Sequence, residues 1–172
     1  MTRNQILAML RRLISDEQAT GFTEGGNMEE PEGTQELLNY LDRAVDEYSK
    51  RQANNKDVRL MKEISVSDNA NIPDDFLSFC GCVPLNIIGK KFRFYITPED
   101  QTEKKNVRYM ARLPYVTDGK YNDDDVLPYD HDQCMAITAL AAVYALNKNE
   151  ANVTQDLLLL GYGVNQNVNN QQ

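Results

Sequence analysis

The feature that most restricts how this chain can fold is an apolar run near the C-terminus, residues 134–146, in which Thr138 is the only polar residue. Asp130 followed three residues later by Gln133 has the spacing of a capping box, so the pattern predicts a helix over about 130–148. A helix that is apolar on nearly every side has to be buried on several faces. Because the run is shorter than the roughly 18 apolar residues of a membrane span, we expect the central helix of a soluble core and no contact with a membrane.

The spacing of apolar residues changes from helical to alternating after residue 56, and back again after residue 128, which predicts an α+β fold. Further helices are expected at about 3–15, 34–54 and 151–160, and strands at about 57–67, 79–88, 91–97 and 106–113. We therefore expect a helical bundle from the N- and C-terminal helices with a small antiparallel β-meander inserted between them. This single domain would cover 1–161, and an extended or disordered C-terminal arm would follow over 162–172.

Local signals support the first two helices and one hairpin. Thr2 with Gln5 has capping-box spacing, Thr34 is a candidate N-cap, and Gly89 with Lys90 predicts a tight turn between two strands. The residues expected on the buried faces are Ile6, Leu7, Leu10, Leu13 and Ile14 in the first helix, and Leu37, Leu41, Ala44, Val45 and Tyr48 in the second.

Charge is unevenly distributed along the chain, whose formal net charge is −8. Residues 16–36 hold seven acids and no Lys or Arg, and residues 118–132 hold six acids and one Lys, whereas residues 90–112 hold seven basic residues and three acids. The net charge argues against nucleic acid as the main partner. Separate acidic and basic patches can pair between neighbouring copies in a head-to-tail contact that closes into a ring. The alternative is that these charged loops are simply solvated.

Few residues favour catalysis or metal binding. The only histidine, His131, is expected at the start of a helix between two aspartates, which suits a surface position, so we assign no catalytic residue. Three cysteines, an odd number, predict free thiols and a reducing compartment such as a cytoplasm. Cys80 and Cys82, expected on one face of a strand, could form a zinc site with His131 and Cys134. The aspartates at 123–125 could instead hold Ca²⁺ or Mg²⁺. We expect neither metal nor cofactor.

Two features exceed what a monomer needs. Four consecutive leucines at 157–160 surround a whole helical turn, so part of this surface should meet a partner or the rest of the domain. The uncharged C-terminal arm could add to a groove or sheet edge of another protein, or could be an unstructured terminus. The residues expected to bind a partner through the arm are Tyr162, Val164, Asn165, Gln166, Asn167 and Val168, and those expected at contacts between subunits or with a partner are Lys90, Lys91, Arg93, Asp123, Asp124, Asp125, Leu157 and Leu160.

The order of these parts resembles the head-to-tail adaptor (connector) proteins of tailed bacteriophages, over about residues 3–161. The resemblance rests on ELLNYLDRA (36–44), IPDDFL (72–77), FRFYI (92–96), VRYMARLP (107–114) and the block from LPYD to AVYA (127–145). It implies a non-enzymatic structural protein at the head–tail junction of a virion, assembled in the host bacterial cytoplasm. The long acidic loop and the Asn/Gln-rich arm depart from the family pattern.

The resemblance to connector proteins also implies partners for this chain. Such subunits form a homo-oligomeric ring, here expected to be dodecameric, beneath the portal protein, and they present a platform for tail nozzle or tube proteins. The C-terminal segment commonly reaches the portal, and passing DNA would be contacted only non-specifically. The alternative is a non-viral cytosolic protein-interaction module that binds one partner through its leucine-rich last helix. A metal-dependent enzyme built on the aspartates is a third possibility.

Overall fold

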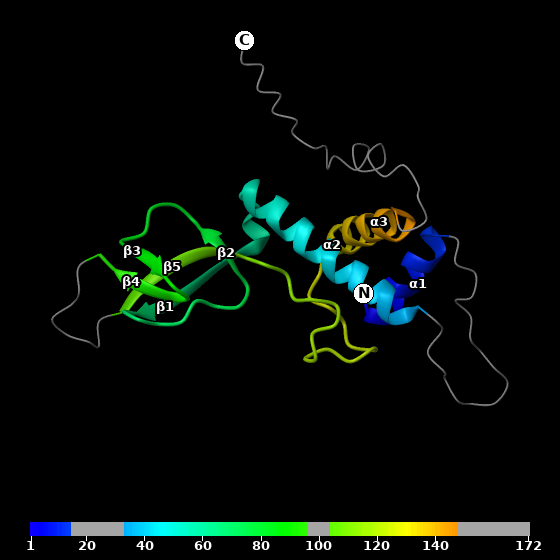
Figure 1. The fold of residues 1–172 in the computed structure, drawn as a ribbon, viewed down its shortest axis with the longest axis horizontal. Coiled ribbons are helices and arrows are strands. Elements are labelled where there is room, and N and C mark those ends of the chain that lie inside the picture. The colour runs from blue at the N-terminus through cyan, green and yellow to red at the C-terminus, as the bar shows by residue number, and fades with distance from the viewer. Residues whose placement is uncertain (15–32, 96–103, 148–172) are drawn as a thin grey trace, which may run out of the picture. The chain divides into compact units, whose positions relative to one another are not determined.

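The computed structural model describes residues 1–14, 33–95 and 104–147 (Figure 1). Within these ranges the helices are α1 (Arg3–Leu13), α2 (Thr34–Asn54) and α3 (His131–Asn147), and a 3-10 turn spans Val58–Leu60. The strands of this part of the chain are β1 (Met61–Ser67), β2 (Phe76–Phe79), β3 (Leu85–Ile88), β4 (Lys91–Phe94) and β5 (Lys104–Ala111). The helix expected over 151–160 and the arm over 162–172 lie outside the described residues.

The chain divides into two compact units, and the division falls within α2. The first unit consists of Met1–Ala44 and Tyr115–Gln172, and so contains α1, the start of α2 and α3. The second unit is Val45–Pro114, which contains the rest of α2 and the five strands named above. The single domain expected over 1–161 includes residues outside the described ranges and stays a prediction.

The expected arrangement of a terminal helical bundle around one β-meander is wrong, although the chain is α+β. The strands form two antiparallel sheets, one of three strands in the order β1-β5-β2 and one made of β3 and β4. Strand β5 lies between β1 and β2, so the strand order does not follow the chain. The run expected as one strand over 79–88 is interrupted because Gly81 has a φ of +82°, in the left-handed region, and Pro84 has no N–H to donate.

Helix α3 is buried on several faces, as its apolar sequence predicts. Ile137 and Leu140, three positions apart, are both fully buried, and Met135 is the exception at 45% exposed. The hydroxyl of Thr138, the one polar residue of the apolar run 134–146, donates to the Cys134 carbonyl oxygen at 2.7 Å. The capping box expected before the helix is confirmed, because the Gln133 N–H donates to Asp130 Oδ1 at 2.7 Å and the Asp130 N–H donates to Gln133 Oε1 at 2.9 Å.

Helices α1 and α2 supply much of the remaining apolar surface of the first unit, and α1 lies beside α3 (Figure 1). The capping box of Thr2 and Gln5 is confirmed. All five residues expected on the buried face of α2 are buried. Leu13, the last residue of α1, is 50% exposed, so its expected burial is wrong. Arg11 is buried there instead, and its guanidinium donates to Thr34 Oγ1 at 2.7 Å. Thr34 is the first residue of α2, after Gly33.

The hairpin expected around Gly89 and Lys90 is confirmed as β3 and β4. Leu85 pairs with Phe94 and Ile88 with Lys91, which leaves Gly89 and Lys90 as a two-residue turn. Gly89 has a φ of +63°, the conformation that a type II′ turn needs at its first central position.

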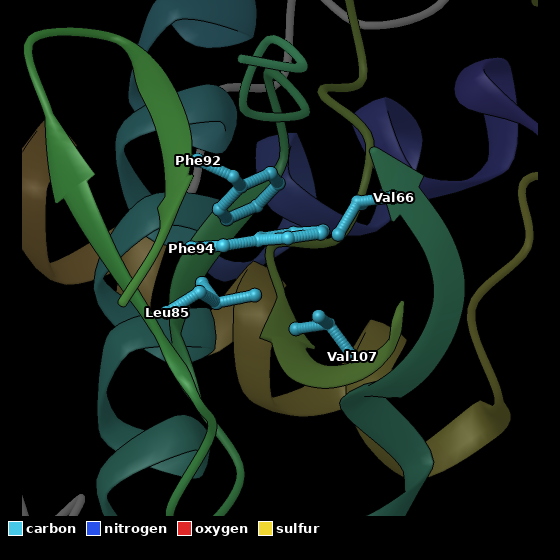
Figure 2. Packing of buried hydrophobic residues seen from close by; sticks show 5 residues of the cluster. All are labelled: Val66, Leu85, Phe92, Phe94 and Val107. Carbon is cyan, nitrogen blue, oxygen red and sulfur yellow. The ribbon is translucent and has the colours of Figure 1, made fainter. Parts of the chain in front are cut away.

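The core of the second unit joins its two sheets. Figure 2 shows Leu85, Phe92 and Phe94 from the hairpin pointing toward Val66 of β1 and Val107 of β5. These five side chains are at most 7% exposed. Partly buried aromatic residues extend this cluster: the rings of Phe76 and Phe92 have centroids 5.9 Å apart in an edge-to-face arrangement.

The burial of α3 can be tested by placing a charge inside it. We expect Leu140→Asp to lower the free energy of unfolding by about 3–5 kcal/mol, because the carboxylate would be buried without a partner. Urea unfolding followed by circular dichroism measures this change. Met135→Asp introduces the same charge at an exposed apolar position of the same helix and should cost much less. Equal losses in the two variants would show that Leu140 is not in the core.

Candidate interaction surfaces

The segment between β5 and α3 carries an acidic cluster, the three aspartates at 123–125, and is held in place by Arg3 of α1. Arg3 Nε donates to the Val116 carbonyl oxygen at 2.9 Å, and Nη2 donates to the Tyr121 carbonyl oxygen at 2.8 Å. Arg3 Nη1 donates to Asp123 Oδ1 at 2.8 Å. A guanidinium has five N–H donors in one plane, so a single side chain can satisfy several carbonyl oxygens of an irregular segment.

Asp42 of α2 holds the beginning of the same segment. Its Oδ1 accepts from the backbone N–H groups of Val116 at 2.7 Å and Thr117 at 3.3 Å, and its Oδ2 accepts from the Thr117 hydroxyl. The side chain of Val116 is fully buried. The Leu127 N–H donates to the Met1 carbonyl oxygen at 3.0 Å, near the other end of the segment. Backbone groups that have no strand partner are therefore bonded to helix side chains and to the N-terminal residue.

The three aspartates expected at a contact are all exposed, but two of them also have partners within the segment or α1. Asp123 forms an ion pair with Arg3 while its side chain stays 56% exposed. Asp125 Oδ2 accepts from the backbone N–H of Asn122 at 2.8 Å and from its side-chain amide at 3.1 Å. The acidic cluster thus presents its charge from a segment fixed at defined points. Sequence reasoning missed Arg3 and Asp42, because neither is near this segment in the chain.

The three basic residues expected at a contact differ in whether they have partners within the second unit. Lys90 and Lys91 are exposed. Arg93 Nη1 donates to Asn69 Oδ1 at 2.9 Å, and its Nε lies 3.7 Å from Asp68 Oδ1. Asp68 Oδ1 also accepts from the Phe94 N–H at 2.9 Å. Arg93 therefore helps to fix the hairpin on the neighbouring turn, and the two lysines are the better candidates for an intermolecular contact.

Exposed apolar side chains that sequence reasoning did not single out lie at both ends of the hairpin, Ile88 beside the turn and Tyr95 just after β4. Ile88 is 65% exposed and Tyr95 is 63% exposed. Alternation along β4 buries Phe92 and Phe94, so Lys91 and Arg93 are on the opposite face, and the cross-strand partner of Lys91 is Ile88. The hairpin thus has one face in the core and one face that combines basic and apolar groups.

The two units differ strongly in charge. Residues 45–114 contain twelve Lys and Arg against ten Asp and Glu, a net charge of +2. Because the whole chain has a net charge of −8, the remaining residues have a net charge of −10. Lys90 and Lys91 belong to the second unit, and the acidic cluster at 123–125 belongs to the first unit. Among the described residues alone, the second unit carries +5 and the first unit −3, so these two compact parts also differ in the sign of their charge.

One group of titratable residues in the second unit is satisfied internally. The hydroxyl of Tyr109 donates to Asp75 Oδ1 at 3.0 Å, and Lys62 Nζ lies 2.5 Å from Asp75 Oδ2. Burial, together with the hydrogen bond to Asp75 and its negative charge, raises the pKa of Tyr109 to about 12. The phenol therefore stays protonated at neutral pH and acts as a donor that ties β5 to the segment before β2.

The four residues considered for zinc do not share an element. Cys80 and Cys82 lie in the connection after β2 and not on one face of a strand, so that expectation is wrong. His131 is an exposed first residue of α3, and Cys134 is fully buried, with a thiol pKa raised by burial. Over residues 1–14, 33–95 and 104–147, no group of three His, Cys, Asp or Glu side chains is placed to hold a metal ion.

Two expectations remain: the partner contacts of the last helix and the arm, and the absence of membrane contact. Leu157, Leu160 and the arm residues Tyr162, Val164, Asn165, Gln166, Asn167 and Val168 lie outside the described residues. Among the helices of the described part, none has the length and apolar character needed to cross a membrane.

Comparison with known proteins assigns no family: no protein-family model matches the chain, and no curated protein matches it. The surfaces described above are therefore the basis for a functional proposal.

The role of Arg3 can be tested by removing its guanidinium. We expect Arg3→Ala to lower the free energy of unfolding by about 1.5–3 kcal/mol, because three hydrogen bonds from a charged donor are lost. Amide hydrogen exchange should become faster at Leu127 and in the neighbouring part of the segment. Arg12→Ala removes an exposed arginine from the same helix and is the matched control. Unchanged exchange in Arg3→Ala would show that Arg3 does not hold the segment.

Proposed function

We propose that this chain is a non-enzymatic structural subunit of a bacteriophage head–tail connector, in which copies form a ring that joins the portal protein to tail nozzle or tube proteins. The observation that carries the proposal is the charge difference between the two compact units, +5 for the described residues of the second unit and −3 for those of the first. The resemblance of the sequence to connector proteins supports it independently. The proposed place of action is the head–tail junction of the virion.

The contact between copies would use unlike surfaces. Lys90 and Lys91 of one copy would face the acidic cluster at Asp123–Asp125 of the next, where Asp124 is exposed. Since each copy has both surfaces, one can engage the preceding neighbour and the other the following neighbour. Contacts of this head-to-tail kind generate a closed ring when the rotation between neighbours divides a full turn.

Charge would decide orientation and association rate more than affinity. An exposed ion pair contributes only about 0–1 kcal/mol, and its effect falls as salt screens the charges. Ile88, the cross-strand partner of Lys91, and Tyr95, just after β4, are both more than 60% exposed. Complete burial of an apolar side chain of this size contributes about 1.5–3 kcal/mol, so these residues would supply much of the affinity.

The proposal also accounts for features outside the hairpin. A net charge of −8 would keep passing DNA from adhering to the ring, so DNA would be contacted only non-specifically. The uncharged arm over 162–172 would provide the attachment to the portal.

The ring contact can be tested by mass measurement of the assembly, with and without a portal ring. We expect the wild type to form a species of more than two copies in the presence of the portal. Lys90→Glu with Lys91→Glu should slow its formation at least tenfold at low salt, with an unchanged Tm, because both side chains are exposed. Lys56→Glu with Lys104→Glu makes the same change in net charge at exposed lysines outside the hairpin and should leave the rate nearly unchanged.

A charge exchange makes this test specific. Copies with Asp124→Lys, mixed with the double lysine variant, should recover much of the rate, whereas each variant alone should assemble slowly. Arg93, Asp123 and Asp125 are kept in all variants because each has a structural partner. Wild-type protein that stays monomeric with every portal supplied would refute the ring.

Attachment to the portal can be tested separately by truncation after residue 161. We expect the shortened chain to keep its Tm, because the removed residues contain few apolar side chains to bury, and to lose most of its binding to the portal. Sedimentation with a portal ring measures the binding, and replacement of residues 162–172 by a Gly/Ser segment of equal length controls for chain length. Full-strength attachment of the truncated chain would exclude a role for the arm.

A further inference from the structure

Two thiols separated by one residue lie in the connection between the two sheets of the second unit. Cys80 directly follows β2 of the three-stranded sheet, and the connection then leads to β3 of the hairpin. The Cys80 N–H donates to the Arg108 carbonyl oxygen of β5 at 2.9 Å, so this cysteine is fixed to the sheet. Cys82 is exposed and has left the sheet.

The backbone brings the two residues within reach of a disulfide. Two residue steps span at most about 7 Å even in an extended chain, and a disulfide accepts Cα atoms about 4.4–6.8 Å apart. The chain is bent at Cys80 and Gly81, which brings the Cα atoms closer than in an extended chain. Gly81 has a φ of +82°, and a Cβ built on it would meet nothing within 4 Å. The side of the bend at Gly81 is therefore open, and a small reagent can approach there.

The two thiols differ in their surroundings. Cys82 is exposed, whereas Cys80 is partly buried. Burial raises the pKa of the Cys80 thiol, and the positive charge of Arg108 acts in the opposite direction. Burial has the larger effect, and the Arg108 guanidinium is also paired with Glu63, whose Oε2 accepts from Arg108 Nε at 2.6 Å. The third cysteine, Cys134, is fully buried in α3 and serves as an internal reference for an inaccessible thiol.

We propose that Cys80 and Cys82 form a thiol–disulfide exchange site for small disulfides of the glutathione class. The Cys82 thiolate attacks one sulfur of the small disulfide, and a mixed disulfide forms while one small thiol is released. The Cys80 thiolate then attacks Cys82 Sγ, so that the Cys80–Cys82 bond forms and the second small thiol leaves. Two protein thiols are oxidised and one small disulfide is reduced to two thiols, so electrons and protons balance.

The product would be a readily reversible link. A disulfide that closes so short a ring is strained, and one at the surface is accessible to reductant, so both features favour reduction. A reducing cytoplasm would keep the thiols free, and an oxidising medium would close the bond. Closure would restrict the connection between β2 and β3 without involving Cys134. This inference does not depend on the proposed ring.

The test exposes the intact, folded chain to excess oxidised glutathione, followed by acid quenching and peptide mass analysis. We expect the wild type to lose two hydrogens in the peptide that contains Cys80 and Cys82, to release two glutathiones per chain, and to retain the Cys134 thiol. In Cys80→Ser the exchange should stop at a mixed disulfide on Cys82. That adduct should be at least about tenfold more abundant than in the wild type, because the neighbouring thiol normally displaces it within the molecule.

Two controls complete the design. Cys134→Ala should behave as the wild type, and dithiothreitol should restore all thiols in both. A wild type that accumulates the Cys82 mixed disulfide to the same level as Cys80→Ser would overturn the proposal. So would glutathione incorporation at Cys134 in preference to Cys82.

Discussion

The structure depends first on the burial of α3, a helix that has almost no polar side and so has to be covered by other elements. In the first unit, α1 packs against α3, and Arg43 of α2 lies over the Tyr144 ring of α3, 4.1 Å from its centroid. Ile6 and Leu10 of α1 and Leu41 of α2 are fully buried. Each fully buried side chain of this size contributes about 1.5–3 kcal/mol, opposed by the entropy of ordering the chain. The three helices therefore stabilise one another, and the positions of their polar residues follow from that packing.

Once the helices are packed, two of their charged residues organise a segment that has no regular structure of its own. Arg3 and Asp42 offer donors and acceptors to the backbone around Val116, where strand partners are absent among the described residues. Such groups would be costly to leave unpaired beside a buried side chain. The exposed aspartates at 123–125 are therefore held near defined anchor points by contacts that originate in the helical core. A surface meant to meet a partner loses less entropy on binding when it is held in this way.

In the second unit the decisive constraint is which face of the hairpin is buried. Phe92 and Phe94 enter the core shared with β1 and β5, so alternation places Lys91 and Ile88 on the other face. The same pairing gives Arg93 partners on the neighbouring turn and removes it from the set of free surface charges. The chemistry of the outer face is thus a consequence of aromatic packing on the inner one.

What the sequence determined by itself were features whose cause is local. Capping boxes, the apolar period of α2 and α3, and the glycine of the hairpin turn each involve residues within a few positions, so the signals could be read directly. Only the tertiary structure decided the insertion of β5 between β1 and β2, the exposure of Leu13 and the partners of Arg93. The same holds for the hydrogen bond from the Arg3 guanidinium to the Tyr121 carbonyl oxygen, which joins residues 118 positions apart. These outcomes depend on which distant segments meet, and no periodicity or spacing within one segment contains that information.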